Sequence, residues 1–174
     1  MSQILLSSES NEWYTPSPII QKAREVMGGI DLDPASCEMA QTWIQATRYY
    51  TQQDDGLTLP WNGRVWLNPP YGQANAKKGV YGSSRWIHKA IDGWQLGEIS
   101  ACLLLVRGDS SGIARLEEIA MECSPRNRIA FVNPGSQKNS PVPGSRIFYL
   151  GSDPDRFARV FADVGAIRVP YFWK

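Results

Sequence analysis

The stretch Ile99-Ser100-Ala101-Cys102-Leu103-Leu104-Leu105-Val106 is apolar at every position except the serine. A short apolar run of this kind is typical of a strand that is buried on both of its faces. Such strands lie in the middle of sheets that carry helices on both sides. The run therefore predicts an α/β domain built around a central sheet.

Strand and helix patterns alternate on both sides of this run. We expect strands at 30–33, 48–51, 64–67, 128–132, 146–150 and 167–172, and helices at 15–27, 36–46, 84–95, 110–122 and from 153 onward. This alternation predicts a mostly parallel central sheet with flanking helices. Residues 1–12 are polar and are expected to form a flexible tail, so residues 13–174 would make one domain.

The composition excludes several classes of protein. The chain has 174 residues, of which 43% are apolar and 20% charged, so it is long enough for one domain with a core. It has one histidine, His88, and three widely spaced cysteines, which argues against a disulfide scaffold, a zinc site and a Ser-His-Asp triad. We expect no metal, no secretory signal and no membrane span, and the cysteine usage fits a reducing cytoplasm.

The formal net charge of +1 hides two segments without acidic residues, 56–91 and 123–152. Their basic residues are Arg64, Lys77, Lys78, Arg85, Lys89, Arg126, Arg128, Lys138 and Arg146. Basic segments of this kind suit a polyanionic partner, although solvated loops would look the same. Lys77, Lys78, Arg85 and Lys138 are the candidates for contacts to such a partner, and the resemblance described below implies that it is double-stranded DNA.

Two segments place polar chemistry after predicted strands, where α/β sheets bind their ligands. One is Asp33-Pro34-Ala35-Ser36, and the other is Asn68-Pro69-Pro70-Tyr71. Two prolines make a rigid turn whose carbonyls are free, the Asn68 side chain offers an acceptor, and Tyr71 offers a flat ring. This set suits a planar group with an exocyclic amine, such as adenine. A proline turn with a packed tyrosine, and a helix cap at Asp33, are the alternatives.

The second segment resembles the catalytic segment of S-adenosylmethionine-dependent amino methyltransferases. The wider pattern resembles the phage-type DNA N6-adenine methyltransferase (Dam-like) family. Four ordered motifs carry this resemblance: Glu12-Trp13-Tyr14-Thr15-Pro16, Asp31-Leu32-Asp33-Pro34-Ala35-Ser36, Asp54-Asp55-Gly56-Leu57 and Trp61–Gly72. The resemblance covers about residues 12 to 150. It implies a Rossmann-like class I methyltransferase fold, trimmed in the half that holds the cofactor.

The resemblance also implies a role for each motif. Asn68, Pro69, Pro70 and Tyr71 would be catalytic, and S-adenosylmethionine would be held by Tyr14, Thr15, Pro16, Asp33, Pro34, Ala35, Ser36, Asp54 and Asp55. The hydroxyl and backbone around Thr15 would hold the amino-acid end of the cofactor, and Asp33 would accept from its ammonium group. The family's glycines are replaced by Ser36, Cys37 and Glu38. Backbone contacts to the cofactor are therefore expected to be fewer there.

The expected activity is that of an adenine-specific DNA methyltransferase, with the target base flipped out of the duplex. The alternatives are methylation of cytosine N4, of adenine in RNA or of a protein glutamine, and an inactive relative that only binds nucleic acid. If the chain is encoded by a phage, we expect it to work in the cytoplasm of the bacterial host. No obligatory protein partner is evident, and the oligomeric state is left open.

Overall fold

The computed structural model describes residues 14–70, 82–108, 110–133, 140–142 and 144–170. The elements in chain order are α1 (Ser17–Met27), β1 (Leu32–Asp33), α2 (Glu38–Ile44), β2 (Arg48–Tyr49), β3 (Gly63–Leu67), α3 (Ser83–Gln95), β4 (Ile99–Arg107), α4 (Ile113–Ile119), β5 (Met121–Pro125), β6 (Ile129–Phe131), β7 (Ser140–Val142), β8 (Ser145–Leu150), α5 (Pro154–Phe161) and β9 (Gly165–Arg168). The tail predicted at residues 1–12 lies outside the described residues. No helix of the described part has the length and apolar run that a bilayer crossing requires.

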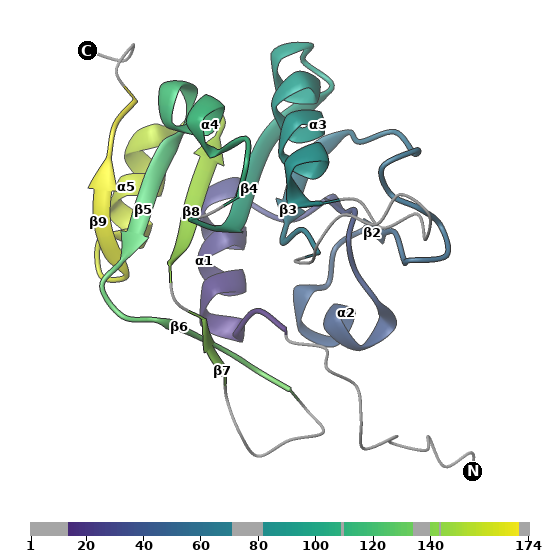
Figure 1. Ribbon diagram of the computed structural model, residues 1–174, viewed down its shortest axis with the longest axis horizontal. Coiled ribbons are helices and arrows are strands. Elements are labelled where there is room, and N and C mark those ends of the chain that lie inside the picture. Colours follow the sequence, from purple (N-terminus) through teal and green to yellow (C-terminus); the bar gives the residue numbers. More distant parts are fainter. Residues whose placement is uncertain (1–13, 71–81, 109, 134–139, 143, 171–174) are drawn as a thin grey trace.

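The main sheet has the strand order β2-β1-β3-β4-β8-β5-β9 (Figure 1). The pairs β1–β2, β1–β3 and β3–β4 are parallel, whereas β4–β8, β8–β5 and β5–β9 are antiparallel. The prediction of a mostly parallel sheet is therefore wrong for the C-terminal half. The chain leaves β5 for the β6–β7 hairpin and returns as β8 between β4 and β5, so β8 runs against both neighbours.

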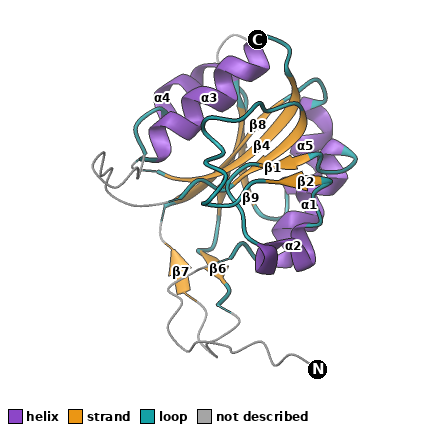
Figure 2. Cartoon of the chain, turned by 90° about the vertical axis from the view of Figure 1, so that its right-hand side faces the viewer, coloured by secondary structure: helices purple, strands orange, loops and turns teal. Residues whose placement is uncertain are grey.

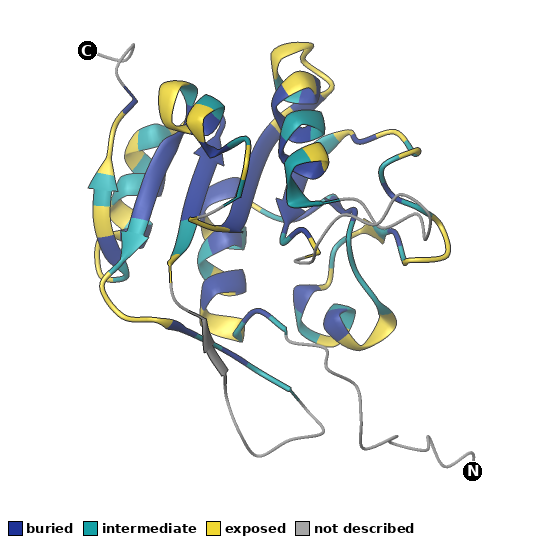
Figure 3. Cartoon of the chain, in the orientation of Figure 1, coloured by how far each residue is buried: buried dark blue, intermediate teal, exposed yellow. Residues whose placement is uncertain are grey.

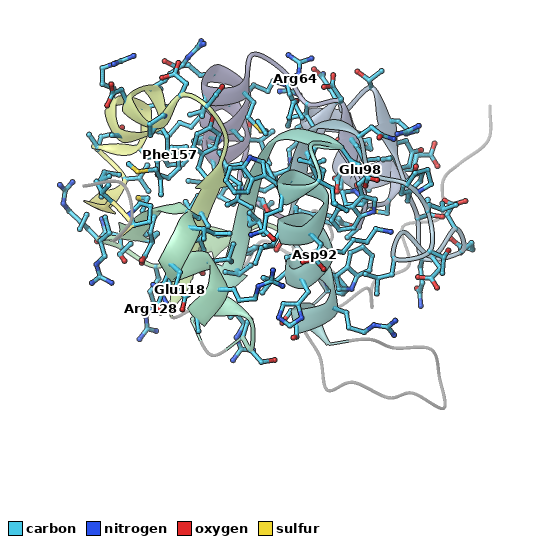
Figure 4. The ribbon with its side chains drawn as sticks, turned by 90° about the horizontal axis from the view of Figure 1, so that it is seen from above. Arg64, Asp92, Glu98, Glu118, Arg128 and Phe157 are labelled. Carbon is cyan, nitrogen blue, oxygen red and sulfur yellow. The ribbon has the colours of Figure 1, made fainter. Side chains whose placement is uncertain are left out.

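Helices cover both faces of this sheet, as the apolar run predicted (Figures 2 and 3). Along β4, Leu103 and Leu105 pack with α1 and α5, while Leu104 and Val106 pack with α3 and α4. Viewed from above in Figure 4, Phe157 lies on the side of α1 and α5, and Asp92 lies on the other side, on α3. Two apolar layers thus enclose the central strands, whose apolar residues are buried.

Several predicted elements differ in extent. The helix expected at 110–122 ends at Ile119, and the chain then forms β5 inside the predicted helix. The strand expected at 128–132 is present as β6, but it pairs with β7 in a separate hairpin (Figure 1). This hairpin is held to the body by an antiparallel bridge between Val132 and Tyr14, with N–H to O distances of 2.8 and 2.9 Å.

The strand order reverses at one point of the sheet, between β1 and β3. The chain makes β1, places β2 on one side of it and then crosses to place β3 on the other side. In α/β sheets the crevice at such a reversal is where ligands bind, because the two connections diverge there. Asp33 ends β1 and Asn68 follows β3, so both lie where this rule predicts the crevice.

A buried ion pair holds the antiparallel half of the sheet together. Glu122 is only 3% exposed, and both of its carboxylate oxygens accept from Arg146, at 2.8 and 2.6 Å. Burial raises the pKa of Glu122, but hydrogen bonds from Arg146 and Ser124 outweigh it and the pKa is lowered. Removing one partner of such a pair leaves the other charge buried without compensation.

We therefore expect Arg146→Met to lower the free energy of unfolding by about 3–5 kcal/mol, as the loss of one partner from a buried pair typically does. The matched control is Arg115→Met, because Arg115 pairs with Asp92 at 3.0 Å on the exposed surface. Its cost should be no more than about 1 kcal/mol. Urea unfolding followed by circular dichroism measures both, and equal losses in the two variants would contradict this assignment.

Candidate active site

Asp33 and Asn68 lie on the same face of the sheet. Leu32 of β1 is paired with Val65 of β3, so Asp33 stands level with Trp66. Side chains alternate along a strand, which puts Asn68, two residues after Trp66, on the face that Asp33 and Trp66 share. This is the face that α1 and α2 cover.

Asn68 has one satisfied and one unsatisfied end. Its Nδ2 donates to Thr15 Oγ1 over 3.2 Å. Its Oδ1 is buried and accepts no hydrogen bond from any residue that the structure describes. The next residue, Pro69, is buried and Pro70 is exposed, so the turn has one side in the protein and one in solvent. Tyr71 lies outside the described residues. A buried acceptor without a donor is costly, which makes Oδ1 a ready partner for an incoming N–H group.

Thr15 is held from two sides. It is 2% exposed, and its carbonyl oxygen accepts from Trp43 Nε1 of α2 over 3.1 Å. Its neighbour Tyr14 forms the bridge to Val132 and stacks edge-on against Trp43 at 5.4 Å between ring centres. The predicted helix at 15–27 began with Thr15, but the cap position is Pro16 and the Thr15 hydroxyl accepts a hydrogen bond from Asn68.

Asp33 is a buried carboxylate, 2% exposed. Its Oδ2 accepts from Gln41 Nε2 at 2.9 Å, and its Oδ1 accepts from the Ala35 N–H at 3.3 Å. Gln41 Nε2 also donates to Ser36 Oγ at 2.7 Å, which links this predicted residue to the same network. Burial raises the pKa of Asp33 to about 6, against the opposing pull of these hydrogen bonds. A cation placed beside Asp33 would stabilise its charged form.

The loop between β2 and β3 contacts Pro34 through Gly56. A Cβ at Gly56 would collide with the Pro34 carbonyl oxygen, so glycine allows this close approach. Asp54 is exposed, and its Oδ2 accepts from the Thr51 N–H at 2.8 Å and the Thr51 hydroxyl at 2.7 Å. Asp55 is half-buried with φ +49°, a left-handed conformation. The structure thus brings Asp55 and Gly56 to the Asp33-Pro34 segment, while Asp54 closes a local turn.

Three residues that the sequence analysis missed hold this arrangement. Gln41 joins Asp33 to Ser36, and Trp43 anchors Thr15. Lys89 of α3 donates to the carbonyls of the loop at Leu57 and Leu59, at 2.7 and 2.6 Å. The position of Gln41, five residues after Ser36 on a predicted helix, was the one available signal. Trp43 and Lys89 act on backbone carbonyls, which leave no pattern in a sequence.

The residues predicted to contact DNA are mostly outside the described part of the chain. Lys77, Lys78 and Lys138 lie there, and only Arg85 can be placed. Arg85 is exposed in the first turn of α3, the helix that follows the Asn68-Pro69-Pro70-Tyr71 segment. This position is at the carboxyl edge of the sheet, as the crevice is.

The two ends of the crevice offer complementary chemistry. Asn68 Oδ1 can accept a hydrogen bond from an amine, and the buried Asp33 can receive a cationic group. Both are fixed by secondary contacts and share one sheet face. The arrangement therefore supplies a buried acceptor and a buried carboxylate on one face of the sheet.

Comparison with known proteins assigns a family. The family model described as DNA N-6-adenine-methyltransferase (Dam) matches residues 2–147, most of the chain. The matched stretch contains Thr15, Asp33 and Asn68 with the elements that carry them. No curated protein and no solved structure matched the chain in the other two comparisons.

The raised pKa of Asp33 predicts how stability depends on pH. The folded protein binds this proton with a pKa of about 6, against an ordinary value of 3.8. The contribution of Asp33 is therefore most favourable below the ordinary value and is lost as pH rises through 6. The difference in unfolding free energy between wild type and Asp33→Asn should shift by about 2 kcal/mol against wild type from pH 4 to 7.5. Denaturant titrations at several pH values measure it, and a constant difference would show that Asp33 is ionised throughout.

Proposed function

Because the chain belongs to the DNA N-6-adenine-methyltransferase (Dam) family, we propose that it transfers the methyl group of S-adenosylmethionine to N6 of an adenine in DNA. The target base would be flipped out of the duplex into a pocket around Asn68-Pro69-Pro70-Tyr71. Flipping is required because a stacked and paired amine cannot reach an enclosed cofactor. We expect double-stranded DNA as the substrate and the cytoplasm of a bacterial host as the setting.

The observation that carries this proposal is the buried Oδ1 of Asn68, which has no hydrogen-bond partner among the described residues and lies at the point where the strand order reverses. An adenine amine has two N–H groups, and Oδ1 would accept one of them. The backbone carbonyl oxygen of Pro69 would accept the other N–H group. A proline nitrogen carries no hydrogen, so the two prolines offer no competing backbone donor. Accepting both hydrogens draws the nitrogen out of conjugation with the ring. Its lone pair then becomes available as the nucleophile.

The residues at the other end of the crevice fit the cofactor. When bound, S-adenosylmethionine supplies an electrophilic methyl group on a sulfonium. Asp33 would accept from its ammonium group, and that charge would favour the ionised form of a carboxylate whose pKa burial has raised. The segment Pro34-Ala35-Ser36 and the loop at Asp55, which meet at Gly56, would line the rest of the site. Tyr71 would stack on the target base.

The fold supports the same proposal. A sheet whose strand order reverses between β1 and β3, covered by helices on both faces, has the arrangement of a Rossmann-like core. Residues 51–62, between β2 and β3, form turns and no helix, which fits a cofactor half that has been trimmed. Asp54 and Asp55 lie in this shortened connection. They are the candidates for contacts to the cofactor that a longer connection would otherwise provide.

We expect Asn68→Ala to abolish methyl transfer while the dissociation constant for S-adenosylmethionine stays within about twofold, because Asn68 contacts the amine and not the cofactor. Asp33→Asn is the matched control, and it should weaken cofactor binding by about tenfold or more. Calorimetry measures binding. Transfer is measured with labelled S-adenosylmethionine and unmethylated DNA, followed by digestion to nucleosides.

The labelled product shows which reaction the protein catalyses, and its absence shows that a variant has lost this reaction. N6-methyladenine is the expected nucleoside. Methylated cytosine as the sole product, or label in protein alone, would overturn the proposal. Equal loss of cofactor binding in Asn68→Ala and Asp33→Asn would show that the Asn68 segment supports the fold rather than the amine.

The basic residues after Tyr71 should act on the phosphate backbone. Replacing Lys77 and Lys78 together by alanine should weaken binding to all DNA sequences alike and flatten the salt slope by about 0.9 per lost phosphate contact. Lys22→Ala is the control, because Lys22 bonds to Asp163 at 2.8 Å on the α1–α5 side of the sheet. Fluorescence anisotropy over a salt series measures both. A loss restricted to one DNA sequence would indicate base recognition instead.

A further inference from the structure

We propose that Gln41 is a positioning residue that holds the carboxylate of Asp33 in one orientation and in its charged form. The sequence motifs gave Gln41 no role. For its consequence this inference rests on the proposed function, in which Asp33 accepts from the ammonium group of S-adenosylmethionine. The hydrogen bonds that support it all lie within the protein.

A backbone group determines the orientation of the Gln41 side-chain amide. Its Oε1 accepts from the N–H of Ala46 over 2.9 Å. A backbone N–H can only donate, so Oε1 lies on that side and Nε2 on the other. Ala46 is brought there by the end of α2, where Gln45 has φ +51° and its N–H donates to the Gln41 backbone carbonyl over 3.2 Å. The amide is therefore fixed before Asp33 is considered.

The Nε2 group of Gln41 has two hydrogens and two acceptors. It donates to Asp33 Oδ2 over 2.9 Å and to Ser36 Oγ over 2.7 Å. Because the Ser36 oxygen accepts from Gln41, the hydroxyl hydrogen of Ser36 can be donated to Asp33. Among the hydrogen bonds that lower the pKa of Asp33, the one from Ser36 is the strongest. Gln41 thus acts on Asp33 directly and also through the orientation of Ser36.

These bonds favour the charged form of Asp33. The remaining bond to the carboxylate is donated by the Ala35 N–H to Oδ1 over 3.3 Å. Burial raises the pKa of Asp33 to about 6, and the three donors oppose that rise. A proton on Oδ2 would meet an N–H of Gln41. The amide cannot turn over to accept it, because Nε2 would then meet the N–H of Ala46.

The other charged and titratable side chains on the elements around Asp33 are exposed or bonded to another group. They are Arg24 of α1, Glu38 of α2, Arg64 of β3, and Tyr14, Cys37 and Tyr50 of the connecting segments. The hydrogen bonds that lower the pKa of Asp33 come from Ala35, Ser36 and Gln41. Ala35 and Ser36 belong to the loop of Asp33 itself, so Gln41 is the donor that α2 adds.

The consequence concerns the affinity for a cation. A charged carboxylate attracts an ammonium group, whereas a protonated one does not. Without Gln41, Asp33 would hold its proton to higher pH, and S-adenosylmethionine would bind more weakly wherever wild type is already ionised and the variant is not. The turnover number at saturating cofactor should change little, because Gln41 acts on binding through Asp33.

The first measurement needs no cofactor. In full-length protein labelled with ¹³C-aspartate, the side-chain carboxyl signal of Asp33 is the one that disappears in Asp33→Asn. Its titration midpoint should rise by about one pH unit in Gln41→Met, which keeps the length of the side chain and removes the donor. Thr42→Val is the matched control on α2, because Thr42 is exposed and its hydroxyl donates to the Met39 carbonyl. Its midpoint should equal that of wild type.

Gln41→Glu is a second variant, in case Gln41→Met does not fold. It keeps the size of the side chain and the acceptor for Ala46, but it sets a second carboxylate beside Asp33. Two carboxylates in contact hold a shared proton to higher pH, so the midpoint of Asp33 should again rise. A midpoint equal to that of wild type in either folded variant would overturn the inference.

Calorimetry with S-adenosylmethionine over a pH series measures the consequence. A rise of one pH unit makes binding to Gln41→Met about eightfold weaker than to wild type at pH 5.5, and within about 1.5-fold at pH 8. Titration of the ammonium group of the cofactor affects both proteins equally. A loss of affinity that is the same at every pH would indicate a merely structural role and contradict the inference. A raised midpoint of Asp33 in a protein that binds no S-adenosylmethionine would leave the action of Gln41 standing and refute the proposed function.

Discussion

The contact between Asp31 and Arg64 fixes β1 beside β3, and the candidate site depends on it. Arg64 donates to the Asp31 carboxylate through its backbone N–H, its Nε and its Nη2, at 2.8, 2.8 and 2.6 Å. The adjacent Gly63 has φ +76°, and a Cβ there would lie 2.6 Å from Asp31 Oδ2. This contact at the amino ends sets the register of the two strands. At their carboxyl ends, Asp33 and Asn68 consequently face the same side.

The sequence predicted those parts of the fold that burial alone determines. Residues 99–106 formed the expected central strand, because burial on two faces leaves an uninterrupted apolar run. The prediction that this half of the sheet is parallel was wrong for β8, since the same apolar pattern fits a strand that runs in either direction. The first residues of β5 were predicted as the end of a helix, because the apolar spacing of Ile113, Leu116 and Ile119 fits a helix. Glu122 can be buried in this strand because Arg146, Ser124 and Arg168 compensate its charge.

The candidate site was predictable to a similar extent. Asp33 and Asn68 could be found because each follows a strand at the edge where ligands bind, and the structure places both at the reversal of strand order. The supporting residues could not be found in this way. Gln41 and Trp43 have these contacts because of where α2 lies against the sheet. This one helix joins Asp33 to Thr15. Contacts of this kind follow from packing rather than from motif.

The same geometry explains why an amide suits position 68 better than a carboxylate. Position 68 lies about 8 Å from Asp33, one strand over and two residues along. At that separation two negative charges repel by about 2 kcal/mol in a partly buried site. Asp33 already has a pKa of about 6, so a second carboxylate would also tend to hold a proton. A protonated carboxyl would present a donor to the proposed target amine, whereas the side-chain oxygen of asparagine is an acceptor at any pH.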